Sequence, residues 1–250
     1  MPVTDWGWLI TPEEIESWII HNDADVLAIH KPGLVLCHPS KHGPCSSLVG
    51  ACREYLGVDR LHMPSRLDRE TSGVVVFAKH PAAASELQTA IEKRAVTKSY
   101  LAILRGELNS TITVDQPIGQ HPAAKVFIRR AVVEGGQAAI TEFEPLTTNQ
   151  GYTLASVKPH TGRMHQIRVH SEWLGHPIVG DKIYGGDETL FLRFIDTGYT
   201  PELARQLEWP RHALHAELLQ FHLKSGTKSF TAPLAPDLVE LCRQHQLTLQ

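Results

Sequence analysis

The chain has 250 residues, of which 42% are hydrophobic and 20% are charged, and this size suits one large domain or one domain with an insertion. A net charge of −3 at pH 7 gives no support to nucleic-acid binding through overall charge. The cysteines include no C-x-x-C pair, the acidic N-terminus lacks the pattern of a signal peptide, and no apolar run approaches a membrane span. We therefore expect a cytoplasmic protein with reduced thiols and no membrane segment. We also expect it to be a monomer.

The N-terminal half contains the clearest signals of secondary structure. Thr11, Pro12 and Glu14 supply an N-cap, a proline at the first helical position and a capping box, which predict a helix over 12–21. The apolar run at 74–79 is nearly continuous and predicts a strand buried on both faces. Further strands are predicted over 25–31, 99–106 and 138–146, and a helix over 81–95.

In the C-terminal half, arms at 152–158 and 164–173 around a turn at 160–162 predict a hairpin. In the second arm Ile167 and Val169 would point to one face, and the polar side chains to the other. The polar side chains of that arm are Gln166, Arg168 and His170.

The end of the chain alternates between helix and strand signals. Thr200-Pro201 opens a short helix within a polar, acidic segment at 186–210, which we interpret as an insertion. Strands over 212–223 and 229–232 and a helix over 236–244 follow. Because strands outnumber helices and pair mostly through turns, we predict an α+β fold with a mixed, largely antiparallel sheet flanked by helices and loops.

Charge is unevenly distributed along the chain. No acid occurs between Asp115 and Glu134 or between Glu144 and Glu172, whereas acids gather from Asp181 onward. We therefore expect one basic and one acidic face, which the net charge conceals. The cations inside the acid-free segments are Lys125, Arg129, Arg130, Lys158, Arg163 and Arg168.

The most informative segment is SRLDRETSG at 65–73, directly before the buried strand. Asp68 lies between Arg66 and Arg69, which in isolation would indicate a solvated ion pair. A loop this rich in charged and polar groups, packed against an apolar strand, is costly for structure alone and favours a functional role. Because guanidinium groups stabilise a charged carboxylate, Asp68 suits a nucleophile or a base better than a general acid.

A second dense segment, KPHTGRMHQIRVH, covers 158–170. Arg168 is either a surface cation of a strand or the fixed partner of a buried carboxylate or a phosphate. His160, His165 and His170 recur every five residues, a spacing that alternates between the faces of a strand, so we predict no metal site.

Other enzyme signatures are missing from the sequence. It contains no G-x-S-x-G elbow, P-loop or G-x-G-x-x-G, which argues against acyl hydrolases, NTPases and dinucleotide-binding enzymes. Tyr100 lies just inside a predicted strand, where a core role is the ordinary explanation. Gly135-Gly136 and Gly185-Gly186 indicate turns.

These motifs resemble those of the RluA-type family of RNA pseudouridine synthases, over residues 23–235. Residues 65–73 are similar to the family motif H-R-L-D-x-x-T-S-G, with Ser65 in place of the usual His. Lys98-Ser99-Tyr100 resembles a basic residue followed by the family Tyr, and 161–170 resembles T-G-R-x-H-Q-I/L-R-V-H. Residues 175–181 and 214–216 fit the family as well.

The resemblance implies an isomerase that converts specific uridines of structured ribosomal or transfer RNA into pseudouridine, without a cofactor. It implies Asp68 as the catalytic carboxylate, Tyr100 as the group that stacks on the uracil and removes the C5 proton, and Arg168 as the partner that keeps Asp68 charged. Arg66 would fill the space that the flipped uridine leaves. The other expected contacts with the RNA are Leu67, Arg69, Lys125, Arg129, Arg130, Lys158, Arg163 and His165.

The implied organisation is an N-terminal extension with a short helix at 1–22, a catalytic domain at 23–235 and a C-terminal helix at 236–250. With no basic RNA-binding domain expected ahead of the first strand, substrate choice would depend on the catalytic domain and its loops. Two other functions remain open. A catalytically silent RNA-binding protein would have no need of Asp68, and a hydrolase of a glycosidic bond would need a second acid, for which Glu70 is a poor proton donor.

Overall fold

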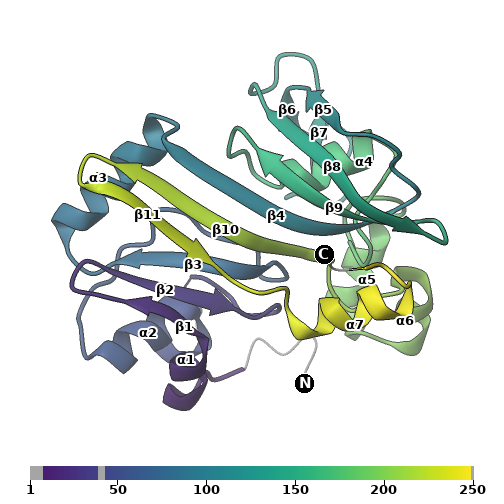
Figure 1. Cartoon of the computed structure of the whole chain (residues 1–250). Coiled ribbons are helices and arrows are strands. Elements are labelled where there is room, and N and C mark those ends of the chain that lie inside the picture. The colour runs from purple at the N-terminus through teal and green to yellow at the C-terminus, as the bar shows by residue number, and fades with distance from the viewer. Residues whose placement is uncertain (1–7, 39–42, 249–250) are drawn as a thin grey trace. The chain divides into compact units, whose positions relative to one another are not determined.

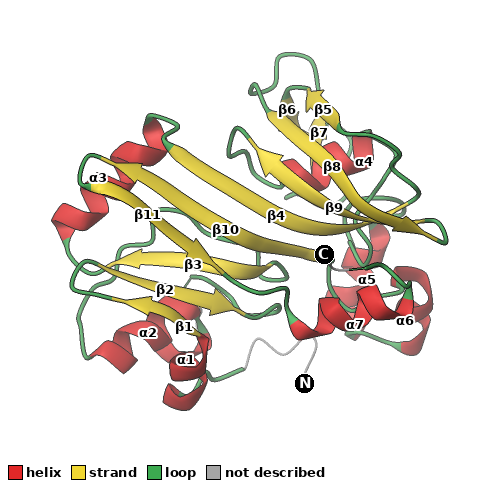
Figure 2. Ribbon diagram, viewed as in Figure 1, coloured by secondary structure: helices red, strands yellow, loops and turns green. Residues whose placement is uncertain are grey.

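The computed structural model describes residues 8–38 and 43–248 and divides the chain into two compact units. The first unit comprises Met1–Lys98 and Ala216–Ala235, and the second comprises Ser99–His215 and Pro236–Gln250. Strands β4 (Val96–Arg105) and β10 (Leu214–Leu223) carry the chain from one unit to the other (Figure 1). The strands pair in antiparallel register and helices flank them, which confirms the predicted α+β class (Figure 2).

The first unit is built on antiparallel strand pairs, with helices against the strands (Figure 2). Strand β1 pairs with β2, β2 pairs with β3, and β10 pairs with β11, each in antiparallel register. The elements are α1 (Pro12–Trp18), β1 (Ile19–Asn22), β2 (Val26–Lys31), the 3-10 helix η1 (Pro44–Ser46), α2 (Leu48–Leu56), β3 (Ser72–Ala78), α3 (Pro81–Glu92) and β11 (Gly226–Thr231).

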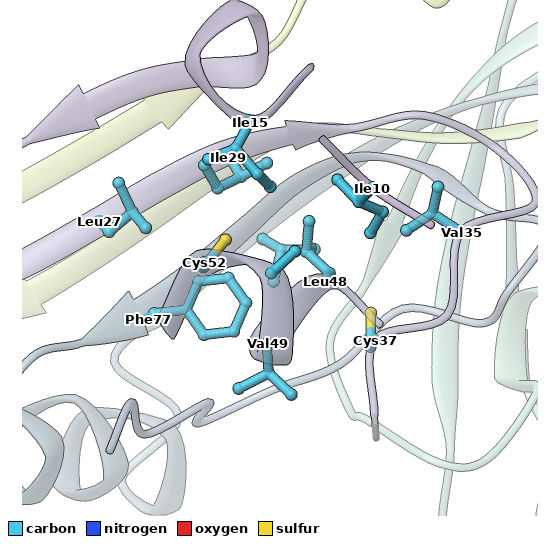
Figure 3. Close-up of a cluster of buried hydrophobic side chains, with 12 residues drawn as sticks. Ile10, Ile15, Leu27, Ile29, Val35, Cys37, Leu48, Val49, Cys52 and Phe77 are labelled. Carbon is cyan, nitrogen blue, oxygen red and sulfur yellow. The ribbon is translucent and has the colours of Figure 1, made fainter. Parts of the chain in front are cut away.

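Strand β3 is buried along its whole length, which confirms the prediction of a strand covered on both faces. Phe77 and Val75 belong to an apolar cluster with Ile15 of α1 and residues of α2 (Figure 3). The alternate residues, among them Val76, pack into a second cluster with Leu87 of α3. The period of two along the strand therefore divides one apolar run between two cores.

Helix α1 begins as predicted but ends earlier. Thr11 Oγ1 accepts a hydrogen bond from the Glu14 N–H at 3.2 Å, and Glu14 Oε2 accepts one from the Thr11 N–H at 3.0 Å, so the capping box is confirmed. The prediction of a helix as far as residue 21 was wrong, because Ile19–Asn22 form β1. Pairing of β-branched residues with β2 here outweighs continuation of the helix.

In the second unit, β4, β9 (Tyr152–Pro159), β8 (Ile140–Asn149) and β5 (Ile112–Asp115) lie side by side in this order, with antiparallel pairing throughout. Strands β6 (Ile118–Gln120) and β7 (Arg130–Val132) form a separate antiparallel pair. The helices are α4 (Gln166–Trp173), α5 (Thr189–Thr197), α6 (Pro201–Leu207) and α7 (Pro236–Gln244). None of the helices in the described ranges is long and apolar enough to cross a bilayer.

The predicted hairpin of 152–158 with 164–173 was wrong. Strand β9 pairs with β8 through a turn at Gln150 and Gly151, which have φ values of 50° and 80°, and 166–173 form the helix α4. The alternation misled because every residue from 166 to 171 is buried, polar side chains included. With no solvent-facing side, the pattern of this short segment has no period to distinguish helix from strand.

Other predictions agree with the structure to varying degrees. Helix α6 begins after Thr200, whose Oγ1 accepts a hydrogen bond from the Leu203 N–H at 3.3 Å, and α7 covers 236–244 as predicted. The sequence did not predict α2, α5, β5 or the β6–β7 pair.

Gly73 at the start of β3 allows a close backbone approach that no other residue permits. Its φ is 114°, and a Cβ atom there would lie 2.1 Å from the Ala216 carbonyl oxygen. We predict that Gly73→Ala lowers the free energy of unfolding by about 2–4 kcal/mol, because conformational strain adds to the clash. Urea unfolding would measure the loss.

Gly57 offers a matched control for Gly73. It caps α2 with a φ of 64°, but its Cβ would meet no atom within 4 Å. Gly57→Ala should therefore cost only about 1 kcal/mol. Equal losses for the two variants would contradict the close approach at Gly73.

Candidate active site

Asp68 lies in a tight turn immediately before β3. The Thr71 N–H donates to the Asp68 carbonyl oxygen at 3.2 Å, and Thr71 and Ser72 are buried at the start of the strand. The Asp68 side chain is half-buried, whereas Arg66 is exposed. The loop thus holds a carboxylate at the edge of a rigid strand and presents a cation to solvent.

A fully buried lysine fixes the backbone of this loop. Lys31 Nζ donates to the carbonyl oxygens of Pro32, Val35 and Arg69, at 2.9, 3.0 and 3.1 Å. These three bonds equal the number of donors of an ammonium group. Lys31, at the end of β2, therefore joins the Asp68 loop to the segment that follows β2.

The underside of the loop is apolar and poorly hydrated. Burial raises the pKa of the Cys37 thiol, which accepts a hydrogen bond from the Leu67 backbone and feels the charges of Asp68 and Arg66. Leu67 packs against the apolar cluster that contains Cys37. Burial also lowers the pKa of Arg69, against the opposing effect of Glu70. The charge of Arg69 is therefore less screened by water than the charge of exposed Arg66.

Tyr100 occupies the central part of β4, in the second unit. It lies opposite Val157 of β9, and its side chain is half-buried. The preceding Ser99 is buried. A ring held on the middle of a paired strand has little freedom to move, which suits a fixed stacking surface.

Arg168 lies on α4 and not on a strand, and it is buried together with a carboxylate. Its Nε donates to Asp181 Oδ2 at 2.7 Å and its Nη2 to Asp181 Oδ1 at 2.9 Å. Burial of Asp181 acts to raise its pKa, but the Arg168 charge and the N–H groups of Ile183 and Tyr184 bring the pKa below the ordinary value. The pair is therefore ionic and closely oriented.

Tyr184 connects Arg168 with the start of α4. The Arg168 guanidinium carbon lies 4.9 Å from the centre of the Tyr184 ring. The Tyr184 hydroxyl accepts a hydrogen bond from the Arg130 N–H at 2.9 Å and shares one with His165 Nδ1 at 2.8 Å. His165 has a φ of 56°, a left-handed conformation that costs energy in a residue other than glycine. The hydroxyl bond holds His165 in it.

The histidines of the second motif serve different environments. His170 is buried and shares hydrogen bonds with Thr141 Oγ1 and the Gln116 carbonyl oxygen, and burial lowers its pKa. Within the described ranges, no group of three or more His, Cys, Asp or Glu side chains could hold a metal ion.

Two of the expected phosphate contacts are neutralised by carboxylates. Lys158 lies 3.3 Å from Glu142 and 3.2 Å from Glu144, both on β8. Arg129 is largely buried between Glu172, at 3.0 Å, and Glu188, at 3.6 Å. The Arg129 charge is therefore balanced by a carboxylate on either side, and its contact with RNA stays a prediction.

The remaining expected contacts are more open to a ligand. Lys125 uses its backbone N–H to bind Glu188 Oε1 at 2.8 Å. Arg163 donates through Nε to the Ala138 carbonyl oxygen at 3.0 Å, and Arg130 donates to Gln120 Oε1 and to Met164 Sδ. Among the described residues, neither Arg130 nor Arg163 has a carboxylate partner.

Sequence reasoning missed three residues that support the candidate catalytic residues of the two units. Asp181 and Tyr184 orient Arg168, and Lys31 fixes the Asp68 loop. Asp181 lies in the segment 175–181, which resembles the RluA-type family, but no sequence pattern predicts its contact with Arg168. Lys31 could have been noticed because it is followed directly by proline at the end of a predicted strand. The sequence gives no sign, however, that its side chain is buried.

Comparison with known proteins matches residues 25–173 to the family model described as RNA pseudouridylate synthase. The chain is 35% identical over 248 residues to the ribosomal large subunit pseudouridine synthase D of Pseudomonas aeruginosa, covering 95% of this chain and 74% of that protein. It is 36% identical over 238 residues to the uncharacterized RNA pseudouridine synthase YjbO of Bacillus subtilis, covering 92% and 77%. The solved structure of human RNA pseudouridylate synthase domain containing 4 aligns with a TM-score of 0.74 and 25% identity, over 95% of this chain and 96% of that one.

Removal of the Asp181 charge should test the pair with Arg168. We predict that Asp181→Asn lowers the free energy of unfolding by about 3–5 kcal/mol, because a buried guanidinium loses its counter-charge. The folded pKa of Asp181 lies below its ordinary 3.8, so its stabilisation is complete above that value and is lost as pH falls through the lower folded pKa. Unfolding free energies measured from pH 2 to 6 should therefore fall less steeply below pH 4 in the variant.

Asp237 provides the control, since it forms a bidentate bond with Arg211 but its side chain is 45% exposed. Asp237→Asn should cost less stability than Asp181→Asn. An equal loss would show that burial of the Arg168 pair has no special weight.

Proposed function

The chain belongs to the RNA pseudouridylate synthase family and converts uridine in RNA into pseudouridine, and we propose that Asp68 is its catalytic carboxylate. The reaction breaks the bond between N1 of uracil and C1′ of ribose, turns the base, and joins C5 to C1′. The C5 proton is lost and N1 gains a proton, so product and substrate are isomers. The balance requires no oxidant and no cosubstrate.

A charged carboxylate can serve this reaction in three ways. Asp68 can attack C1′, add to the base, or remove a proton from the sugar, and each route uses the ionised form. The observation that carries the proposal is the placement of Asp68 on a half-buried turn fixed by Lys31. A reacting group held by packed backbone needs little reorganisation during the reaction.

Tyr100 and Arg168 complete the proposed catalytic group. The Tyr100 ring would stack on the uracil, and its hydroxyl would remove the C5 proton after the base has turned. Arg168 would pair with Asp68 and keep it charged, while Asp181 and Tyr184 hold the guanidinium in orientation. The Asp68–Arg168 pairing joins residues of different units and stays a prediction.

The target uridine must leave its stack to reach such a site, at a cost of a few kcal/mol. Exposed Arg66 would fill the space that the base leaves, with Leu67 fixing the loop below it. Arg69, Lys125, Lys158 and His165 stay in the proposed RNA contact set.

We infer that the substrate is ribosomal RNA of the large subunit, because several similar proteins bear that name. An enzyme of ribosomal RNA would act in the cytoplasm of a bacterial cell. A monomeric state stays a prediction, which sedimentation would test.

Replacement of Asp68 by asparagine tests the catalytic proposal, since it keeps the shape and removes the charge. We predict a loss of more than about 1,000-fold in pseudouridine formation, with the Kd for RNA changed by less than about threefold. The measurement is pseudouridine content of ribosomal RNA from cells lacking the gene, after incubation with the purified protein. A parent protein that binds RNA but forms no pseudouridine would identify a silent binder, and release of free uracil would identify a hydrolase.

Arg168→Lys tests the positioning role, because lysine retains the charge but loses the bidentate bond. We predict that kcat falls about 100-fold, the scale expected when a reacting group is displaced by about 1 Å, while the Kd for RNA changes little. Arg211→Lys is the matched control, since Arg211 binds Asp237 at the same two distances, 2.7 and 2.9 Å. It should leave kcat near the parent value. A loss confined to RNA affinity in Arg168→Lys would contradict the role.

A further inference from the structure

A surface pocket of about 390 Å³ lies in the second unit, between the β6–β7 pair and the loop before α4. Its volume falls in the range of small-ligand sites. The side chains that define its chemistry are Gln120, Arg130, Gln137, Arg163 and Met164.

The pocket gathers two positive charges that no acid in the described part of the chain balances. Arg163 uses Nε to bind the Ala138 carbonyl oxygen at 3.0 Å, which leaves its terminal nitrogens without hydrogen bonds to the described residues. Arg130 donates to the neutral acceptors Gln120 Oε1 and Met164 Sδ. Two guanidinium groups beside one cavity favour an anion with several oxygens.

One wall of the pocket is held by a buried glutamine. Gln166 Oε1 accepts from Thr161 Oγ1 at 2.7 Å and from the Arg163 N–H at 3.0 Å. Its Nε2 donates to the Ile140 carbonyl oxygen and to Thr141 Oγ1, both at 2.9 Å. The backbone of Arg163 is therefore fixed to β8 before any ligand arrives.

The opposite wall depends on the Gly135-Gly136 turn. A Cβ atom on Gly136 would lie 2.8–3.0 Å from the backbone of Ile118, so only glycine allows the turn to lie against β6. Mutual hydrogen bonds between the backbones of Ile118 and Gln137, at 2.9 and 2.8 Å, hold it there. Gly135 has open space around its Cβ position, so this wall presents backbone to the pocket.

An exposed aromatic ring projects from the loop that connects β6 to β7. Phe127 is 83% exposed, although the loop around it is well anchored. Glu188 accepts hydrogen bonds from the Lys125 and Val126 N–H groups at 2.8 and 3.2 Å, and Gln120 Nε2 donates to the Phe127 carbonyl oxygen at 2.8 Å. A fixed, exposed ring costs apolar surface and is typical of a platform on which a nucleic-acid base stacks.

We propose that this pocket binds a phosphodiester of the substrate RNA between Arg130 and Arg163, and that a neighbouring unpaired base stacks on Phe127. The inference rests on the proposed function, since it assigns the pocket to the same RNA. Gln120 links the two parts, because its amide orients Arg130 through oxygen and the Phe127 loop through nitrogen. The site fixes the path of a single strand and reads no particular base.

The test compares RNA binding by the full chain and three variants over a range of salt. In the double variant Arg130→Gln with Arg163→Gln, Kd should rise about tenfold. The plot of the logarithm of the association constant against log salt should become less steep by about 1. Phe127→Ala should also raise Kd about tenfold, with an unchanged slope, because stacking releases no counterion. Arg243→Gln is the control, since Arg243 is paired with Glu240 on α7, and its Kd and slope should equal those of the parent.

An unchanged Kd and an unchanged salt slope in the double variant would contradict phosphodiester binding by this pocket. If that variant still forms pseudouridine, the proposed function holds independently of the pocket. Thermal unfolding of each variant checks that the fold is intact, and exposed Phe127 gives a second variant that cannot disturb the core. Uridine monophosphate is added as a competitor. Displacement of RNA by micromolar nucleotide, in the parent alone, would assign the pocket to a free nucleotide and overturn its assignment to the RNA chain.

Discussion

The buried ion pair between Arg168 and Asp181 organises the second unit. Burying two charges is costly unless every donor and acceptor is satisfied, and Asp181 meets this condition through the guanidinium and two backbone N–H groups. The same carboxylate thereby fixes the turn that carries Tyr184, whose ring covers Arg168 and whose hydroxyl binds His165. One pair thus sets the start of α4 and the orientation of the proposed partner of Asp68.

The first unit also contains a buried charge, the ammonium group of Lys31. Lys31 is as deeply buried as any residue of the core, and it donates hydrogen bonds to three backbone carbonyl oxygens. Its hydrogen bond to the Arg69 carbonyl oxygen fixes the Asp68 loop and places a positive charge in the low-dielectric interior of the first unit. In each unit, therefore, a buried cation gives rigidity to the segment from which the proposed chemistry comes.

The sequence predicted the parts of the fold that follow from local rules. The capping box at Thr11, the doubly buried strand β3 and the helix after Thr200 each follow from a few adjacent residues. The segment 164–173 was mispredicted because burial on all sides removed its periodicity. The contact between Arg168 and Asp181 forms only in the folded chain, and a single sequence does not show which residues come into contact on folding.

The distribution of charge along the sequence also fails to predict which charges pair in the folded chain. Long stretches without acids suggested a basic face, but the acids at their borders fold back onto them: Glu142 and Glu144 bind Lys158, and Glu172 binds Arg129. The acidic segment after Asp181 likewise supplies Glu188, which anchors the basic loop instead of forming a separate face. Lys158 and Arg129 are thus paired with carboxylates, whereas no carboxylate among the described residues pairs with Arg130 or Arg163. An acidic protein can in this way offer RNA a localised site, since the field at a pocket depends on its unbalanced neighbours and not on the net charge.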